Sequence, residues 1–132
     1  MARTNKIPLI LFAMDLNGFK LINDRLGHSS GDLVLIEVGN VLKFVFRDSD
    51  IIARSGGDEF LVLVVNSEAN NIEILKERLS VAMKSCNSVI KHRMEIGLSV
   101  GTATFDGTTD DSLDDLINQA DSEMYLDKRG GE

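Results

Sequence analysis

Residues 51–65 read Ile-Ile-Ala-Arg-Ser-Gly-Gly-Asp-Glu-Phe-Leu-Val-Leu-Val-Val. Two runs of the β type, Ile51–Arg54 and Glu59–Val65, flank the tetrapeptide Ser55-Gly56-Gly57-Asp58. Glycine and aspartate between apolar, β-branched runs are typical of a tight turn, so this stretch predicts a β-hairpin. The other predicted elements are arranged around this hairpin, which carries two carboxylates at its tip.

Short apolar runs and helical spacing on both sides of the hairpin predict six further elements. They are a strand over Leu9–Met14 that ends in Asp15, a helix over Gly18–Leu26, a helix from Ser29 or Ser30 to Phe46, a helix over Asn70–Cys86, a strand over Met94–Phe105 and a capped helix over Ser112–Lys128. The order βααββαβα predicts an α+β fold, an α/β sandwich in which helices pack on a central sheet of mixed, mainly antiparallel direction.

The length of 132 residues suffices for one compact core, and no repeat or Pro/Ser-rich linker divides the chain. We therefore expect a single domain over residues 1–132, in which residues 1–7 are an abbreviated leader or an artificial start. The longest apolar runs are well short of the roughly 20 residues that a membrane-spanning helix needs. The one cysteine, Cys86, forms no internal disulfide, and a reducing cytoplasm is the expected compartment.

The net charge of −7 would repel the phosphate backbone of DNA or RNA, and no basic cluster in the sequence offsets it. A nucleic-acid polymer is therefore not the expected partner. Small nucleotides fit better, because bound divalent cations bridge carboxylates and phosphates. The acidic run Asp110–Asp127 is interpreted as the solvated face of a helix, without chemistry.

Three carboxylates stand where the predicted strands end. Asp15 closes the first strand, and Asp58 and Glu59 lie at the tip of the hairpin. If the strand and the hairpin are neighbours, the three groups converge and can hold one or two Mg²⁺ ions, which prefer hard oxygen ligands. Taken alone, Gly56-Gly57-Asp58 is more commonly a tight turn with a solvated aspartate.

The segment after Asp15 has the chemistry of a nucleotide site. Backbone amides near Gly18 and Phe19 open a helix and are followed by Lys20, a combination suited to a polyphosphate. Asn23, together with Asp32 in the first turn of the next predicted helix, offers the donors and acceptors that the edge of guanine requires. As single residues, these side chains are equally typical of helix caps and surface groups.

The chain resembles the GGDEF family of diguanylate cyclases in three separate motifs. They are Met14-Asp15-Leu16-Asn17-Gly18-Phe19-Lys20-Leu21-Ile22-Asn23-Asp24, Gly27-His28-Ser29-Ser30-Gly31-Asp32 and Arg54-Ser55-Gly56-Gly57-Asp58-Glu59-Phe60. The likeness continues through Ser99-Val100-Gly101 and from Ala120-Asp121 to Tyr125 and Lys128, so it covers nearly everything from Leu9 onward.

The resemblance implies a palm-like, nucleotidyl-cyclase-like fold and an enzyme that condenses two GTP into cyclic di-GMP, with release of pyrophosphate, as a homodimer with Mg²⁺ or Mn²⁺. It assigns the metals to Asp15, Asp58 and the carbonyl of Leu16, with Glu59 in support. It also makes Asp58 the base that deprotonates the attacking 3′-hydroxyl. The implied substrate contacts are Gly18, Phe19, Lys20 and Lys128 for the triphosphate, and Asn23 and Asp32 for guanine.

A second site is implied upstream of the hairpin. Arg47-Asp48-Ser49-Asp50 is followed by five residues and then Gly56, the offset of the family's Arg-x-x-Asp inhibitory site for cyclic di-GMP. Arg78 matches a second arginine of that site, and guanidinium groups suit phosphates and guanine edges. The alternative is a surface ion pair worth about 0.2–1 kcal/mol.

The sequence also departs from the family pattern. The Asp-x-Leu-Thr-Gly-Leu-x-Asn-Arg segment and the helix that usually precede the first strand do not match, so we expect a fragment whose sensory domain lies upstream. The full-length protein could be membrane-attached with this domain facing the cytoplasm. Glu132 stands where the family has an arginine, which would weaken GTP binding. Asn17 replaces a second acid and is expected to be tolerated, because the metal ligand is Asp15.

Two other functions remain open from the sequence. The chain could be a GGDEF-like domain that has lost turnover and binds GTP or cyclic di-GMP as a regulatory module. It could also be an α+β interaction domain without a nucleotide, a reading that requires three motifs to agree by accident. The intact run from Gly56 to Phe60 favours the enzyme, whereas the unmatched upstream segment and Glu132 favour the binding module.

Overall fold

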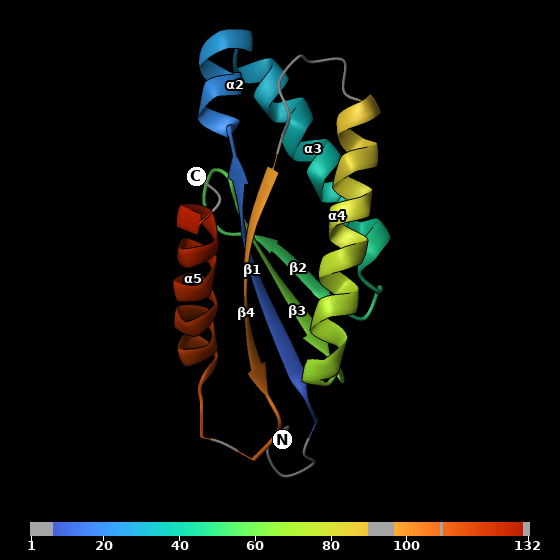
Figure 1. Ribbon diagram of the computed structural model, residues 1–132, viewed down its shortest axis with the longest axis vertical. Coiled ribbons are helices and arrows are strands. Elements are labelled where there is room, and N and C mark those ends of the chain that lie inside the picture. The colour runs from blue at the N-terminus through green and yellow to red at the C-terminus, as the bar shows by residue number, and fades with distance from the viewer. Residues whose placement is uncertain (1–6, 90–96, 109, 131–132) are drawn as a thin grey trace.

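A computed structural model describes residues 7–89, 97–108 and 110–130 (Figure 1). In chain order, the elements are β1 (Leu9–Asn17), α2 (Phe19–Leu26), α3 (His28–Val45), β2 (Ile51–Arg54), β3 (Glu59–Val65), a 3₁₀ turn (Ala69–Asn71), α4 (Ile72–Val89), β4 (Gly97–Phe105) and α5 (Leu113–Gly130). This order confirms the predicted succession of strands and helices, with the 3₁₀ turn as an addition.

The four strands form one sheet in the order β2-β3-β1-β4, and every neighbouring pair is antiparallel. The sheet is therefore antiparallel throughout rather than of mixed direction. The helical crossover from β1 does make β2 run in the same direction as β1, but β3 lies between them. In the same way, β1 separates β3 from β4, so no parallel pair forms.

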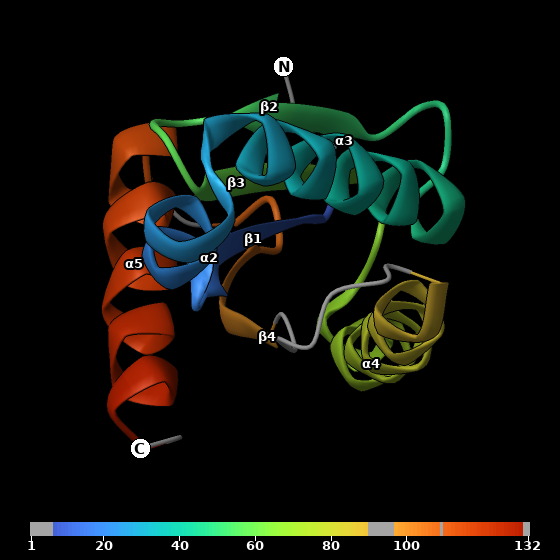
Figure 2. The ribbon, with the colours of Figure 1, turned by 90° about the horizontal axis from the view of Figure 1, so that it is seen from above.

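Two apolar cores lie on opposite faces of the sheet, because successive side chains of β1 point to opposite sides. Ile10, Phe12 and Met14 face the larger core, which α2, α3 and α4 cover. Leu11 and Ala13 face the smaller core under α5. Figure 2 shows the domain from above, with α5 on one side of β1 and β4 and α4 on the other. The order of the layers is the α/β sandwich predicted from the sequence.

Two element boundaries differ from the predictions in ways that affect the site. The strand β1 runs to Asn17, because its pairing with β4 continues to Gly97. The helix α3 begins at His28, directly after Gly27 with φ 92°, so Asp32 lies beyond its first turn. The predicted position of Asp32 in the first turn is therefore wrong, and its carboxylate is exposed.

The start of α5 confirms the predicted cap. The backbone N–H of Asp115 donates to the Ser112 hydroxyl at 3.1 Å, and the N–H of Ser112 donates to the Asp115 carboxylate at 2.9 Å. This reciprocal pair satisfies donors that the first turn of a helix leaves free.

The acidic residues of α5 are not only a solvated face. The carboxylates of Asp127 and Glu123 accept hydrogen bonds from the backbone N–H groups of Val100 and Thr102, at 2.9 and 3.3 Å. These N–H groups lie on β4, the edge strand of the sheet, and the carboxylates occupy donors that another strand could otherwise pair with. Both residues are exposed, as expected for the solvated face predicted over Asp110–Asp127, and they also make these structural hydrogen bonds.

None of the helices within the described ranges combines the length and apolar character that crossing a membrane requires. Some predictions concern residues outside the described ranges. They are the predictions for residues 1–6, for Met94 to Ile96 of the expected strand and for Glu132. The same holds for the side chain of Cys86.

Candidate functional site

The antiparallel register brings the end of β1 against the tip of the hairpin. Asp15 on β1 is the direct cross-strand partner of Glu59 on β3. The backbone N–H of Leu16 donates to the carbonyl of Asp58 at 3.0 Å, which fastens the end of β1 to the turn. The predicted convergence of Asp15, Asp58 and Glu59 is thus present in the structure.

Asp58 and Asp15 lie close enough to influence each other's charge. Partial burial raises the pKa of Asp58 above its ordinary value of 3.8, and the negative charge of Asp15 and a side-chain hydrogen bond with it raise the pKa further. The positive charge of Lys128 acts in the opposite direction but is the smaller effect. Two carboxylates that disfavour each other's ionised form are a natural binding site for a cation.

Lys128, in the last turns of α5, reaches this pair from the opposite side. Its ammonium nitrogen lies 2.9 Å from Oδ2 of Asp15, whose side chain is only 15% exposed. The other oxygen, Oδ1, is buried and has no hydrogen-bond partner among the described residues. Because a buried carboxylate oxygen without a partner is costly, Oδ1 has the character of an unused ligand atom.

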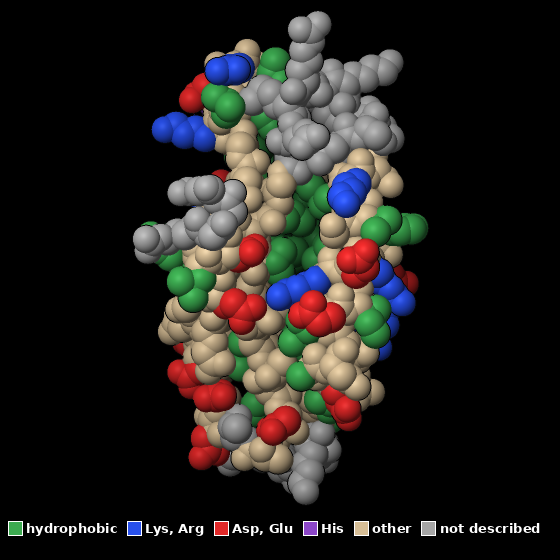
Figure 3. All heavy atoms as spheres, viewed as in Figure 1, with side chains coloured by type: hydrophobic (Ala, Val, Ile, Leu, Met, Phe, Trp, Pro, Cys, Tyr) green, Lys and Arg blue, Asp and Glu red, His purple; other side chains and the backbone are tan. Residues whose placement is uncertain are grey.

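A fourth carboxylate, Asp121 on α5, belongs to the same cluster. Partial burial raises the pKa of Glu59 above 4.5, and the negative charge of Asp121 is the next largest cause; a hydrogen bond with Ser55 opposes them. Asp121 Oδ1 is also buried without a partner among the described residues. Sequence reasoning missed Asp121 by assigning it to a solvated face, although it directly follows the buried Ala120. Figure 3 shows red Asp and Glu side chains along the side of the molecule that α5 forms.

The geometry fits a metal ion that takes few protein ligands. Within the described ranges, no group of three or more His, Cys, Asp or Glu side chains could hold a metal by itself. Mg²⁺ commonly binds through one or two carboxylates and completes its shell with water and substrate phosphates. Asp15, with its unpartnered Oδ1, and Asp58 suit that chemistry, whereas Glu59 is directed toward Ser55 and Asp121.

The side chain of Asn17 forms hydrogen bonds with Ser99 on the neighbouring strand β4. Its side-chain nitrogen donates to the Ser99 hydroxyl at 3.0 Å, and that hydroxyl donates to the Asn17 oxygen at 3.2 Å. Ser99 is buried and is the cross-strand partner of Asp15. The amide at position 17 thus pairs with the hydroxyl as both donor and acceptor, which a charged carboxylate could not do.

The start of α2 lies one residue beyond β1. Gly18 adopts φ 84°, a left-handed conformation that favours glycine, and it has no side chain to cap the helix. Phe19 packs against the larger core, while Lys20 is exposed. The N-terminus of α2 and Lys20 thus follow the end of β1 within three residues, and their binding of a polyphosphate stays a prediction.

The two residues predicted to read guanine lie on adjoining helices. Asn23 is half-buried on α2, and Asp32 is exposed on α3. The helices are joined only by Gly27, whose backbone N–H donates to the carbonyl of Asn23 at 3.0 Å. His28, interpreted from the sequence as structural, is exposed at the first position of α3.

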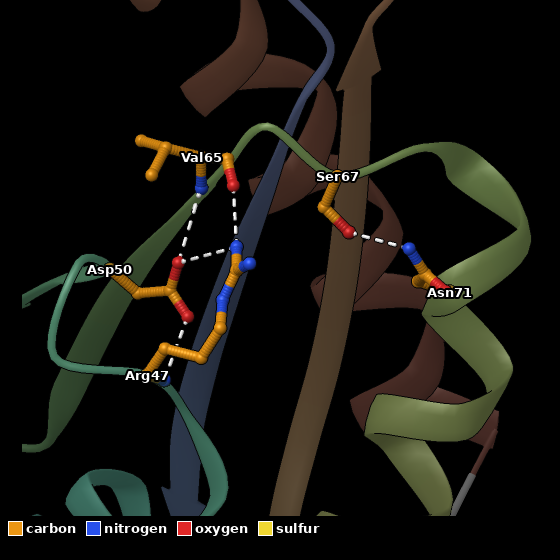
Figure 4. Close-up of polar contacts among 5 residues, drawn as sticks. All are labelled: Arg47, Asp50, Val65, Ser67 and Asn71. Atoms are coloured by element: carbon orange, nitrogen blue, oxygen red, sulfur yellow. Dashed lines mark hydrogen bonds and ion pairs between the residues drawn. The ribbon is translucent and has the colours of Figure 1, made fainter.

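The second predicted site lies at the far end of α3 (Figure 4). Asp50 has a side chain that is only 2% exposed, and its carboxylate accepts from the Arg47 guanidinium at 3.2 Å, the Arg47 backbone N–H at 2.9 Å and the Val65 N–H at 3.2 Å. Arg47 also donates to the carbonyl of Val65. The pair is therefore not the exposed surface ion pair considered as an alternative, because one partner is buried and fully used.

Arg78 joins these residues around one cleft of about 210 Å³. The walls of this cleft come from the end of α3, the connection from α3 to β2, β3, the segment and 3₁₀ turn after β3, and α4. The lining residues are Val45, Arg47, Asp50, Val64, Ser67, Asn71, Ile74, Leu75 and Arg78. Within this lining, the Ser67 hydroxyl accepts a hydrogen bond from the Asn71 side-chain amide at 2.8 Å (Figure 4). The structure thus brings Arg47, Asp50 and Arg78 together, and Asp50 serves mainly to orient Arg47.

Comparison with known proteins agrees with the site. The family described as "Diguanylate cyclase, GGDEF domain" matches residues 1–132. Diguanylate cyclase DgcP of Escherichia coli is 37% identical over an aligned stretch of 134 positions, which covers 98% of this chain and 38% of that protein. The bifunctional diguanylate cyclase/cyclic di-GMP phosphodiesterase MucR of Pseudomonas aeruginosa is 39% identical over 122 residues, 92% of this chain and 18% of that protein. The chain thus spans well under half of either relative.

Solved structures show the same fold. The active GGEEF domain of a diguanylate cyclase from Vibrio cholerae superposes with a TM-score of 0.88 at 28% identity, over 98% of this chain and 82% of that one. The GGDEF domain of DgcB from Caulobacter crescentus, in complex with c-di-GMP, superposes with a TM-score of 0.87 at 28% identity, over 99% and 78%. With its hairpin carboxylates placed against Asp15 and a family match along its whole length, this chain belongs to the GGDEF family of diguanylate cyclase domains.

Proposed function

We propose that this domain condenses two molecules of GTP into cyclic di-GMP, with release of pyrophosphate. The observation that carries the proposal is the contact of Asp15 with Asp58 beside Lys128, with one buried carboxylate oxygen unpartnered. This arrangement suits a nucleotide triphosphate that arrives with divalent cations, and the family match supplies the reaction class.

Asp15, Asp58 and the backbone of Leu16 would hold Mg²⁺ or Mn²⁺, which supplies charge neutralisation for the triphosphate when bound. Glu59 supports the site through its position opposite Asp15 in the sheet. The amides at Gly18 and Phe19, with the cations of Lys20 and Lys128, bind the phosphates. Lys128 is already aimed at this site through its ion pair with Asp15.

In the proposed reaction, Asp58 accepts the proton of a 3′-hydroxyl. The freed oxygen forms a bond to the α-phosphorus of the other GTP, and the bond from that phosphorus to the bridging oxygen breaks to release pyrophosphate. A second, equivalent step closes the ring. The raised pKa of Asp58 makes its carboxylate a better proton acceptor than an exposed aspartate. Because each domain presents one GTP, the active species is a homodimer.

The metal-bridged site makes GTP affinity depend on Mg²⁺. A triphosphate brings about four negative charges to a carboxylate cluster, so cations must lie between them. We expect GTP to bind tightly with Mg²⁺ and at least about tenfold more weakly in excess chelator. Calorimetry measures both affinities, and separation of nucleotides after incubation with GTP and Mg²⁺ detects cyclic di-GMP. Equal affinity under both conditions would refute the metal-bridged site.

Guanine specificity follows from Asn23 and Asp32 in the same proposal. A site built for the donors of guanine leaves polar groups unpaired when adenine enters. Asp32→Ala is expected to lower GTP affinity by about tenfold or more while leaving the weak affinity for ATP unchanged. Competition between the two nucleotides measures the ratio. Tight ATP binding that ignores the substitution would point to another nucleotide.

We further propose that the cleft at Arg47 and Arg78 binds the product. Two guanidinium groups reach the cleft from different elements and suit the phosphates and guanine edges of cyclic di-GMP. Asp50, buried and engaged with Arg47, holds that guanidinium in place. Contact of Asp50 with guanine itself would require the carboxylate to exchange one of its present donors.

Arg47→Ala is expected to abolish saturable binding of cyclic di-GMP, because it removes one of the two guanidinium groups that line the cleft. Arg25→Ala, on the exposed face of α2, is the matched control and should bind like the wild type. Titration calorimetry with purified product measures both. Undiminished affinity in Arg47→Ala would remove this site from the proposal.

A regulatory binding module is the second candidate function, and the separate Arg47–Arg78 cleft is the observation that favours it. In that case, cyclic di-GMP binds and GTP with Mg²⁺ yields no product. Under either function, we propose that the domain works in the cytoplasm as one part of a longer signalling protein, because its curated relatives are much longer than the matched region.

A further inference from the structure

A close contact links α2 to α3 at Gly31. An added Cβ on Gly31 would lie 1.8 Å from Oδ1 and 2.9 Å from Cγ of Asn23. Real side chains do not approach this closely, so the amide of Asn23 occupies the space that any other residue at position 31 would fill. Gly31 is buried, and its backbone N–H donates to the carbonyl of Gly27 at 3.2 Å.

The three atoms nearest to the added Cβ all belong to the amide group at the end of the Asn23 side chain. None of these three atoms is a backbone atom. Gly31 lies inside α3, in a helical conformation that alanine adopts readily. A methyl group at this position would therefore displace the amide of Asn23 and leave the helices in place. The two helices continue to be joined through Gly27, whose backbone N–H bonds to the Asn23 carbonyl.

We infer that Gly31 is a specificity-determining residue. Because it has no side chain, it leaves the space, here called the seat, in which the amide of Asn23 is held for the recognition of guanine. Asp32 follows Gly31 directly, so the same turn of α3 that seats the amide also carries the second guanine-reading residue. The inference rests on the proposed function, in which Asn23 and Asp32 read the base. Gly31 acts as a positioning residue and touches no substrate atom itself.

The test compares two Gly→Ala substitutions in one helix. Gly31→Ala places a methyl group on the Asn23 amide, whereas the added methyl group of Gly39→Ala has no neighbour within 4 Å among the described residues. Both add a better helix former, so their effects on helix propensity are matched. Affinities are measured with Mg²⁺ and with GTP and ATP analogues in which a methylene replaces the α,β-bridging oxygen, so that no turnover occurs.

We expect Gly31→Ala to lower the ratio of GTP-analogue to ATP-analogue affinity by about tenfold, the effect of one lost hydrogen bond to the base. The affinity for the ATP analogue should stay unchanged, because the phosphate contacts do not involve Asn23. Gly39→Ala should keep the wild-type ratio. A Gly31→Ala protein that keeps its fold but loses affinity for both analogues equally would overturn the inference.

A double-mutant cycle tests the route through Asn23. If Gly31 acts only through that amide, Gly31→Ala has no further effect on the ratio in an Asn23→Ala background. Should Gly31→Ala alone fail to fold, recovery of the fold in the double variant supports the seat, and an unfolded double variant refutes it. An undiminished effect in the Asn23→Ala background also refutes it.

The outcomes separate this inference from the function on which it rests. A wild-type protein without preference for the guanine analogue overturns the proposed guanine site and the role of Gly31 with it. In a different outcome, the wild type, Gly39→Ala and Gly31→Ala all prefer the guanine analogue to the same degree. That result would leave the proposed function intact and would overturn the role of Gly31 alone.

Discussion

Asp58→Asn is expected to abolish synthesis of cyclic di-GMP, with turnover lowered by about a thousandfold or more. The substitution removes the proposed general base, which typically contributes about 10²–10⁴-fold, and it removes a carboxylate of the proposed metal site beside Asp15. The shape of the side chain is kept, and the carbonyl of Asp58 still accepts from the Leu16 N–H. Quantified nucleotide separation after incubation with GTP and Mg²⁺ measures the loss.

The same substitution should leave the metal-free protein as stable as the wild type or more stable. The pKa of Asp58 is raised, so the folded state binds this proton more tightly than the unfolded state does. The stabilisation is therefore present below the ordinary pKa of 3.8 and is lost as the pH rises through the raised value. Thermal melts in chelator against pH should show a weaker decline in Asp58→Asn. Asp48→Asn, on an exposed residue, is the control and should keep both activity and pH dependence.

The hairpin and the meeting of its tip with Asp15 could be predicted because both depend on local signals. Gly56-Gly57-Asp58 between two apolar runs specifies the turn, and the bounds of both strands agree with the structure. A strand that ends in a carboxylate then needs only to pair with this hairpin for the charges to converge. The direction of the whole sheet was less accessible, because it depends on β3 inserting between β1 and β2.

The family resemblance assigned Lys128 of α5 to the site, but the contribution of the α5 acids could not be predicted, because it depends on how the helix lies across the sheet. Asp114, Asp121 and Asp127 all read as surface acids in the sequence. In the structure, Asp121 faces Glu59, Asp127 binds the edge strand and Asp114 is exposed in the first turn. The approach of Lys128 to Asp15 is of the same kind, since the two residues are 113 positions apart.

The Arg47–Asp50 pair was visible in the sequence, but its burial was not. Asp50 is buried because the end of β3 supplies the Val65 N–H, and the chain must fold before these groups meet. A motif known for ligand binding thus also closes the connection between α3 and β2. Removal of Asp50 would leave donors unpaired, so Arg47 is the better residue for testing product binding without disturbing the fold.

Gly101→Ala is expected to destabilise the domain by about 3 kcal/mol or more. Gly101 lies where α5 crosses β4, and an added Cβ would stand 2.0 Å from the Ala120 carbonyl oxygen and 2.2 Å from the Met124 backbone nitrogen. Both atoms belong to the helix backbone and cannot move aside alone. The whole helix must shift, and with it the apolar contacts of Leu116, Ala120 and Met124 with the sheet.

Gly97→Ala in the same strand is the matched control, because among the described residues its added Cβ would meet only the Asn17 side chain, at ordinary distances of 3.6 and 3.7 Å. Urea unfolding of the two variants measures the difference, and a Gly101→Ala protein as stable as Gly97→Ala would contradict the close packing of α5. The folded fraction of Gly101→Ala should also bind GTP with Mg²⁺ more weakly. A helix displaced from β4 withdraws Lys128 from Asp15 and Asp121 from Glu59, so the backbone contact at Gly101 sets the geometry of the carboxylate site.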